Sequence, residues 1–320
     1  MIRKISLTIT SLLGLAAATG LAADKTYTFG VIAKSNNNPV FQAAKTGAED
    51  EAAKLSKEHG VTIKIDWRTP NEEDPQKQAD AVEQLVNAGA NGIAISCSDA
   101  NKLTDAIDKA VDNGVPVVTF DSDAPKSKRL AIFGTDDIDC GKKTMSELAK
   151  VMGGKGTVAI LAGNQNAPNL QKRVEGVREE AKNYPDIKIL DAYYHKETPQ
   201  DAAAKVEQVM QAHPEITGWA MIGGWPLFTD NALKFAPGTV KVVAVDALPA
   251  ELGYLKSGHV QVLLAQQVYE WGTKSVDMLY DMVADNKKPA STFVKGELIP
   301  VTKDNVDEFA QNWAKWLPKK

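Results

Sequence analysis

Val117-Val118-Thr119-Phe120-Asp121 returns later in the chain as Val242-Val243-Ala244-Val245-Asp246, at an offset of 125 residues. Two further matches occur in the same order and at nearly the same offset: Ala33-Lys-Ser-Asn-Asn-Asn-Pro39 with Ala162-Gly-Asn-Gln-Asn-Ala-Pro168, and Val82-Glu83-Gln84 with Val206-Glu207-Gln208. The shared order and the near-constant spacing indicate an internal repeat. The chain is therefore expected to contain two lobes built on one plan.

Short runs rich in β-branched residues alternate with helical periods from Tyr27 onward, which is typical of parallel βαβ units. The runs that predict strands are Tyr27–Ala33, Thr62–Asp66, Gly92–Ser96, Pro116–Phe120, Thr157–Ala162, Ile187–Ala192, Gly218–Ile222 and Val240–Val245. The helices between them have clear limits. Asp74 caps one that ends at Gly89, and Asp99 caps the next, which ends at Gly114. The sequence predicts an α/β fold with two doubly wound parallel sheets.

The composition is that of a globular protein. Of 320 residues, 43% are hydrophobic, 24% charged and 7% aromatic, which excludes a disordered, collagen-like or polytopic membrane protein. This length leaves room for two domains. The formal net charge is −4, and an acidic balance argues against nucleic acid or anionic lipid as a partner.

The amino terminus predicts secretion. Residues 1–4 are short and cationic, residues 5–18 are apolar, and small residues precede an expected cleavage near Ala22 or Ala23. Residues 1–22 are therefore expected to be a signal peptide. A membrane anchor is the weaker alternative, because Thr, Ser and Gly residues dilute the apolar run below what a spanning helix needs.

Two cysteines, Cys97 and Cys140, would then meet an oxidising compartment. The sequence leaves open whether they form a disulfide or stay as two buried thiols. Neither they nor the scattered histidines have the spacing of a metal site, so we expect no metal and no cofactor. Residues 153–157, Gly-Gly-Lys-Gly-Thr, precede a predicted strand and lack the order of a phosphate loop.

Polar residues follow the predicted strands, where the loops of a doubly wound sheet form the ligand crevice. They are Lys34, Ser35, Asn36, Asn38, Trp67, Arg68, Ser96, Asp121 and Asp123 in the first lobe, and Asn164, Asn166, Asn169, Tyr194, His195, Trp225 and Asp246 in the second. Half of these are carboxylates and amides that bind hydroxyls, and a few are aromatic planes. No nucleophile is paired with a base. The set predicts a site for a neutral polyol without catalysis.

Simpler roles are open for several of these residues. An Asp after a strand is often a helix cap, although the match of Asp121 with Asp246 across the repeat favours the crevice. Arg173, which follows Lys172, can be a solvated helix residue. Trp225 stands between pocket and core, and Lys34 can be only a charge at the end of a strand.

Five segments in register give the chain a resemblance to a family: Gly30-Val-Ile-Ala-Lys-Ser-Asn-Asn-Asn-Pro-Val-Phe41, Gly92-Ile-Ala-Ile-Ser96, Pro116-Val-Val-Thr-Phe-Asp121, Ala244-Val-Asp246 and Ala265-Gln266. They resemble the ribose-binding branch of the periplasmic sugar-binding proteins of ABC transporters, from about Tyr27 to about Val301. The resemblance implies two Rossmann-like lobes joined by a three-segment hinge. The lobes would be 24–134 plus 267–296 and 135–266 plus 297–320.

The resemblance also implies which residues bind the ligand. The family's hydroxyl-binding positions fall on Asn38, Asp121, Arg173, Asp246 and Gln266, and Ser96 replaces an asparagine.

Several residues depart from the family pattern. Only Phe41 remains of a common aromatic pair, so Trp225 or Trp67 would supply the second plane. Lys34 and Asp123 resemble the related autoinducer and rhamnose receptors. Asn169, one of the polar residues that follow the predicted strands, is a further candidate ligand-binding residue.

The expected function is a periplasmic receptor, a monomer, that captures a monosaccharide or sugar alcohol and hands it to the membrane permease of an ABC importer. An autoinducer- or rhamnose-type receptor of the same fold is one alternative. A secreted α/β enzyme is weaker, because no Gly-x-Gly-x-x-Gly follows the first strand. A transcription regulator of this plan would begin with a basic helix-turn-helix rather than a signal peptide.

Overall fold

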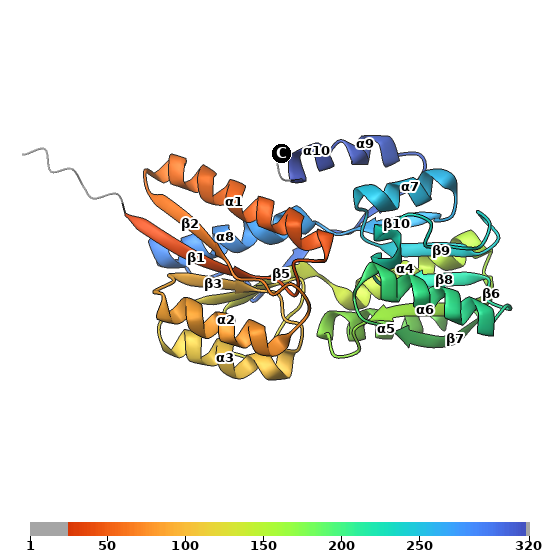
Figure 1. Cartoon of the computed structure of the whole chain (residues 1–320), viewed down its shortest axis with the longest axis horizontal. Helices are drawn as coiled ribbons and strands as arrows, with labels where there is room; N and C mark the ends of the chain where they lie inside the picture. Colours follow the sequence, from red (N-terminus) through yellow and green to blue (C-terminus); the bar gives the residue numbers. More distant parts are fainter. Residues whose placement is uncertain (1–24, 318–320) are drawn as a thin grey trace, which may run out of the picture.

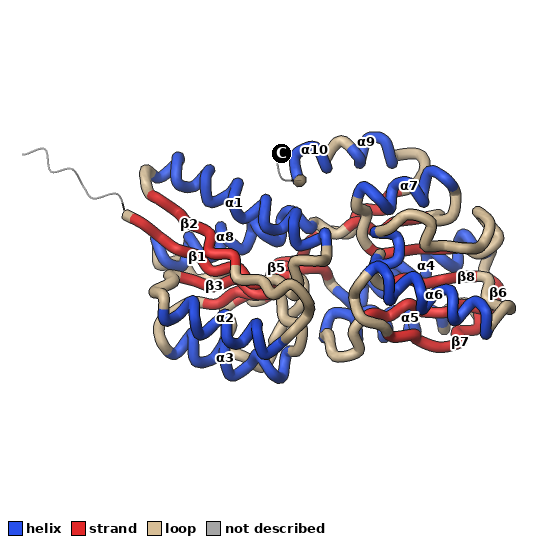
Figure 2. Tube along the Cα trace, in the orientation of Figure 1, coloured by secondary structure: helices blue, strands red, loops and turns tan. Residues whose placement is uncertain are grey.

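Two lobes lie side by side in the computed structural model of the chain, which describes residues 25–317 (Figure 1). Each lobe is a sheet covered by helices on both faces, as Figure 2 shows. The predicted signal peptide, residues 1–22, lies outside the described residues. Among residues 25–317, no helix is long and apolar enough to cross a bilayer.

The first lobe holds a six-stranded sheet in the order β11-β5-β4-β3-β1-β2. Its pairs are all parallel. Helices α1 and α8 pack together on one face, and α2 and α3 on the other (Figure 1). The elements are β1 (Thr26–Ile32), α1 (Pro39–His59), β2 (Thr62–Trp67), α2 (Pro75–Asn87), β3 (Gly92–Ile95), α3 (Ala100–Asp112), β4 (Val117–Phe120), β5 (Ala131–Thr135), α8 (Val268–Ala284) and β11 (Phe293–Gly296).

The second lobe repeats this order as β12-β10-β9-β8-β6-β7. The last strand differs, because β12 pairs with β10 in the antiparallel direction. The elements are α4 (Asp137–Met152), β6 (Lys155–Gly163), α5 (Pro168–Ala181), β7 (Asp186–Tyr194), α6 (Pro199–Ala212), β8 (Gly218–Met221), the 3-10 turn η1 (Trp225–Phe228), β9 (Lys241–Val245), α7 (Pro249–Ser257), β10 (Val262–Ala265), β12 (Ile299–Val301), α9 (Val306–Ala310) and α10 (Trp313–Trp316). The prediction of two doubly wound lobes is confirmed.

Within the described residues, the chain passes between the sheets after β5, after β10 and after β11. These passages support our proposed division of the chain into 24–134 plus 267–296 and 135–266 plus 297–320. The C-terminal segment runs back over both lobes (Figure 1). There the Trp313 indole donates to the Ala247 carbonyl, 2.8 Å away, and the Trp316 ring stacks on Tyr269 of α8.

Local chemistry explains the helix limits. Asp74 and Asp99 each accept hydrogen bonds from the first-turn amides of α2 and α3, as the sequence predicts. Asp136 caps α4 in the same way. The two cysteines are separate buried thiols, so the disulfide that the sequence left open does not form. Burial raises the pKa of Cys140 to about 12, which makes its thiol unreactive.

Candidate functional site

Residues from both lobes line one cavity between them. The first lobe contributes Lys34, Asn38, Val40, Phe41, Asp121 and Trp271, and the second lobe and hinge contribute Asn169, Leu170, Arg173, Glu197, Gly223, Trp225, Asp246 and Gln266. The cavity volume is about 20 Å³, which is room for about one water molecule. Pockets that enclose small-molecule ligands measure ~300–1,000 Å³. The lobes must therefore separate, or the side chains must move, before a sugar can enter.

Two residues of the predicted ligand-binding set do not line this cavity. Asp123 forms an ion pair with Arg129 at 2.7 Å and accepts a hydrogen bond from Thr119 at the same distance. Its carboxylate is thus already paired within the first lobe, and Asp123 is not part of the ligand-binding set that we propose. Ser96 is fully buried and donates to Asp121 Oδ2 at 2.7 Å. It positions Asp121 rather than touching the cavity.

Asp121 lies at the end of β4 and points its carboxylate toward the second lobe. Its backbone is in the left-handed region, with φ 57°, which Asp tolerates better than most residues. No helix begins at Asp121, so it is not a helix cap. Besides the bond from Ser96, its Oδ1 accepts from Asn169 Nδ2 at 3.1 Å. Asn169 belongs to α5, so this hydrogen bond joins the two lobes.

Asp246 occupies the equivalent place after β9. It too has a positive φ, 84°, and it is 6% exposed. Its Oδ1 accepts from Gln266 Nε2 at 2.8 Å. Burial raises the pKa of Asp246, while the hydrogen bond from Gln266 opposes the rise. A side chain at Gly224 would collide with the buried carboxylate of Glu251, which explains a glycine beside this site.

Arg173 connects the second lobe to the hinge. It is 2% exposed, so it is not the solvated helix residue that the sequence left open. Its guanidinium donates to Asp137 Oδ1 at 2.9 Å, to the Ile222 carbonyl at 3.1 Å and to Gln266 Oε1 at 2.6 Å. The same Gln266 oxygen accepts from Thr135 of β5 at 2.9 Å. Burial raises the pKa of Asp137 to about 6, and Arg173 opposes that rise.

Lys34 lines the cavity, is 2% exposed, and is more than a charge at the end of a strand. Its ammonium lies 3.9 Å from Asp121 Oδ2 and 3.7 Å from Glu197 Oε1, and it donates to Asn169 Oδ1 at 3.4 Å. Burial lowers the pKa of Lys34, but Glu197 and Asp121 outweigh that effect and hold it above its usual range. Lys34 is therefore charged and links the lobes.

Three polar or aromatic residues that lie in or beside this cavity were not predicted from the sequence. Glu197 lines the cavity three residues beyond the end of β7. The residues predicted to follow this strand end at His195. Glu73 precedes the α2 cap and accepts from Asn164 of the second lobe at 2.9 Å. Trp271 lies inside α8, where no strand-end rule applies.

Aromatic rings form two apolar walls. Phe41 lies against Trp271, with the ring centroids 6.0 Å apart, on the first-lobe side. Trp225 is 4% exposed on the other side, and its indole donates to Glu197 Oε2 at 3.3 Å. Trp67 donates instead to Asn36 Oδ1 at 2.8 Å and does not line the cavity. Trp225 is thus the better placed of the two candidate planes.

The chemistry of this arrangement is recognition by hydrogen bonds. Carboxylates, amides and two cations converge from both lobes on a small volume with aromatic walls, which is the pattern of a small-molecule site. Within residues 25–317, no group of three or more His, Cys, Asp or Glu side chains could hold a metal ion. The site can pair the donors and acceptors of several hydroxyl groups.

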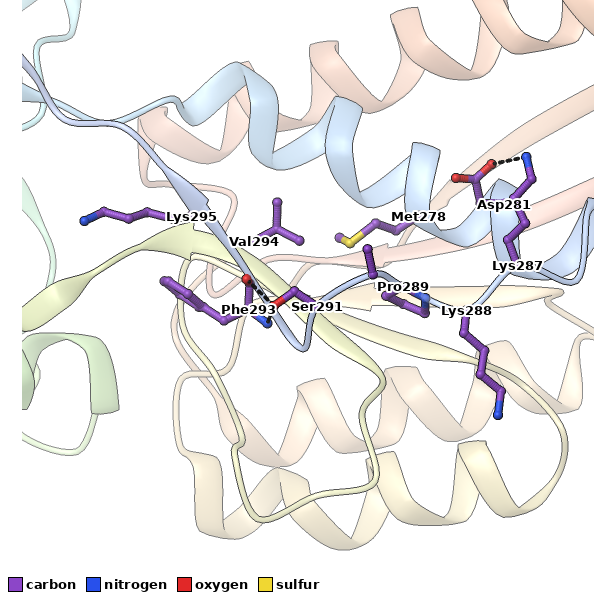
Figure 3. A pocket seen from close by; sticks show the side chains of 10 residues that line it. Met278, Asp281, Lys287, Lys288, Pro289, Ser291, Phe293, Val294 and Lys295 are labelled. Carbon is purple, nitrogen blue, oxygen red and sulfur yellow. Dashed lines mark hydrogen bonds and ion pairs between the residues drawn. The ribbon is translucent and has the colours of Figure 1, made fainter.

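A larger hollow of about 530 Å³ lies elsewhere, between the end of α8 and β11 of the first lobe (Figure 3). Its lysines are partly paired already, since Lys287 contacts Asp281 and Asp285 at 3.5 and 2.6 Å. Phe293 is 40% exposed there. No buried polar groups converge on this hollow, so the interlobe cavity is the candidate site.

The family model described as a periplasmic binding protein domain matches residues 29–288. Among curated proteins, the chain is 26% identical over 271 residues to a ribose import binding protein of Bacillus subtilis, covering 82% of this chain and 84% of that protein. It is 27% identical to a xylitol-binding protein of Mycolicibacterium smegmatis, covering 77% and 70%.

Solved structures agree with the fold. An ABC transporter solute-binding protein of Burkholderia graminis, in complex with D-arabinose, is 27% identical with a TM-score of 0.80, covering 88% of this chain and 97% of that one. A glucose-galactose binding protein of Geobacillus stearothermophilus is 25% identical, also with a TM-score of 0.80, and the shares are 88% and 99%.

Proposed function

The chain belongs to the periplasmic binding protein domain family, and from that premise we propose that it captures a neutral monosaccharide or sugar alcohol between its lobes. It then delivers this ligand to the permease of an ABC importer. The relatives are named as binding proteins for ribose and xylitol, which supports a binding role without turnover. The protein captures the ligand in the periplasm and acts as a monomer.

One observation carries this proposal. Asp121, Arg173 and Asp246 are each 2 to 6% exposed and converge from both lobes on one cavity. Buried charged groups are retained where they bind something or each other. Hydrogen bonds to charged groups contribute ~1.5–3 kcal/mol each, so a few of them exceed the ordering costs and reach micromolar affinity, about −8 kcal/mol.

Binding and closure are coupled in this proposal. A ligand shifts the lobes toward the closed state only if it binds that state better. The candidate residues lie on both sides of the cavity, so a sugar that touches both gains contacts only when the lobes meet. The permease would recognise that closed form.

The related receptor for autoinducer or rhamnose rests on Lys34 and Asp123. Lys34 lines the cavity, but Asp123 is held by Arg129. Only one of the two residues that support this alternative lines the cavity, so we prefer the sugar or polyol receptor.

A thermal-shift screen tests the function. Purified mature protein is mixed with pentoses, hexoses, deoxysugars, polyols and, as controls, amino acids. We expect a higher melting temperature with one or a few sugars or polyols and no chemical change in them, because a ligand at ~100 Kd stabilises the folded state by ~2.7 kcal/mol. Shifts with amino acids and none with any sugar or polyol would refute the proposal.

A further inference from the structure

Lys34 and Glu197 face each other across the cavity with hydrogen-bonding capacity to spare. Lys34 Nζ and Glu197 Oε1 are 3.7 Å apart, which is too long for a hydrogen bond between them. The Glu197 side chain is 5% exposed, yet its Oε1 has no hydrogen-bond partner among residues 25–317. Buried polar atoms are rarely left in that condition.

The two groups offer complementary capacity. An ammonium has three donors and no acceptor, and an ionised carboxylate accepts only. Within the described residues, the Lys34 ammonium makes one long hydrogen bond, 3.4 Å to Asn169. Glu197 Oε2 is already engaged by the Trp225 indole. Lys34 thus has donors free, and Glu197 has one oxygen free.

A hydroxyl group is the function that satisfies both at once, because it donates one hydrogen bond and accepts others. An oxygen atom about 2.8 Å from each group fits beside a gap of 3.7 Å. A carbonyl or a carboxylate accepts only, so either would leave Glu197 Oε1 unpaired, and a carboxylate would also be repelled by it. A methylene or methyl group would satisfy neither partner.

We propose that Lys34 and Glu197 form a subsite that binds one hydroxyl of the ligand, accepting from Lys34 Nζ and donating to Glu197 Oε1. This inference rests on the proposed function and adds a specificity rule to it. The ligand carries a free hydroxyl at this point, and its deoxy, keto and carboxylate analogues are rejected there. Lys34 and Glu197 come from different lobes, so this hydroxyl also ties the lobes together.

The surroundings favour a neutral ligand over an acidic one. Asp121 lies 3.9 Å from Lys34, and Glu73 brings a further buried carboxyl group from the first lobe. Burial and then repulsion from Glu197 raise the pKa of Glu73. A sugar acid would add one more carboxylate to this cluster, so uronic acids are expected to bind far more weakly than the parent sugars.

Isothermal titration tests the subsite as a double cycle of protein and ligand. The wild type is titrated with D-ribose, D-arabinose, D-xylose and xylitol, and each binder is compared with its monodeoxy analogues. The protein variant is Glu197→Gln, which keeps the shape and removes the charge. Glu179→Gln is the matched control, because Glu179 pairs with Lys142 at 2.9 Å on exposed helix surface away from the cavity.

We expect Glu197→Gln to bind the parent sugar at least about tenfold more weakly, since the lost bond is charge-assisted. One monodeoxy analogue should show a similar loss with the wild type and little further loss with Glu197→Gln. Glu179→Gln should match the wild type throughout. Lys34→Met provides a second variant with the same expected pattern, should Glu197→Gln fail to fold.

The outcomes separate the two proposals. If the wild type binds none of the four neutral probes or any other sugar or polyol, the proposed function fails and the subsite fails with it. If the wild type binds a probe but Glu197→Gln and Lys34→Met bind it equally well, only the subsite is refuted. It is refuted too if every deoxy analogue loses the same factor in wild type and variant.

Discussion

Asp121 and Asp246 occupy equivalent places in two sheets of the same strand order, yet their partners differ. Asp121 accepts a hydrogen bond from Asn169 of the opposite lobe. Asp246 accepts from Gln266, which Arg173 also binds, next to the hinge. The repeat therefore places two carboxylates at one cavity, but the two carboxylates have different hydrogen-bond partners. The first holds the lobes together, and the second is held by the hinge.

The comparison teaches that a shared fold sets position, whereas the neighbours set the role. In both lobes the residue after the fourth strand has a positive φ and is 6% exposed. The two residues differ in the element that contacts them. The start of α5 of the second lobe contacts Asp121, whereas the end of β10 contacts Asp246. Substitutions on the two sides should then affect folding, binding and closure in different proportions.

The largest effect is expected from the hinge side. Arg173→Met leaves Asp137 buried without its partner, which costs ~3–5 kcal/mol when a buried ion pair is broken from one side. The free energy of unfolding, measured in urea, should fall by that amount. Arg178→Met is the matched control on the same helix, because its ion pair with Asp191 is 48% and 68% exposed and is worth ~0–1 kcal/mol. Equal losses in both variants would contradict the network at the hinge.

A smaller effect is expected from the two carboxylates themselves. Asp121→Asn and Asp246→Asn should each weaken sugar binding by ~2 kcal/mol, roughly 30-fold, by removing a charged acceptor. Calorimetric titration measures this loss. Small-angle scattering of the ligand-free proteins then separates them. Asp121→Asn should widen the lobes more than Asp246→Asn, because only Asp121 is bonded across the cavity. The same scattering from both variants would break the comparison.

Position after a strand was the part of the site that could be predicted. The position of Asp121, Asp246 and Lys34 at one cavity follows from the sequence, because parallel strands end at one edge of a sheet. Asp123 was misplaced on the cavity by the same rule, because nothing in the local sequence shows that Arg129 takes its carboxylate. Glu197 was overlooked since the loop after β7 continues past His195. In both cases the outcome depends on side-chain contacts that form only in the folded chain.

The fold was predictable for a related reason. Strands β1, β2, β3, β4, β6, β7, β8 and β9 were expected within about two residues of their observed ends, since apolar runs alternate with capped helices. Strands β5, β10, β11 and β12 were not predicted. Two of these, β11 and β12, are short, partly exposed and have no helix between them. They gain strand structure by pairing with the sheet edges β5 and β10.

The smallest effect is expected at the rim of the cavity, where Glu73 of the first lobe approaches the second lobe. Burial, then repulsion from Glu197, raises the pKa of Glu73 to about 8 from 4.5. Between those values the folded state keeps a proton that the unfolded chain has lost. The folded state therefore binds more protons there, and its stability falls as the pH rises.

Glu73→Gln removes that dependence, so the variant should be more stable than the wild type above pH 8 by at least about 1.4 kcal/mol, which corresponds to a single pKa unit. The difference should shrink as the pH falls and vanish below the unfolded value of 4.5. Melting temperatures across this range measure it, with the exposed neighbour Glu72→Gln as the control. A constant difference between Glu73→Gln and wild type at all pH values would mean that Glu73 is not held protonated by the closed lobes. The rim would then contribute nothing to the asymmetry between the two sides, which would rest on the hydrogen bonds that Asp121 and Lys34 make with Asn169 of the second lobe.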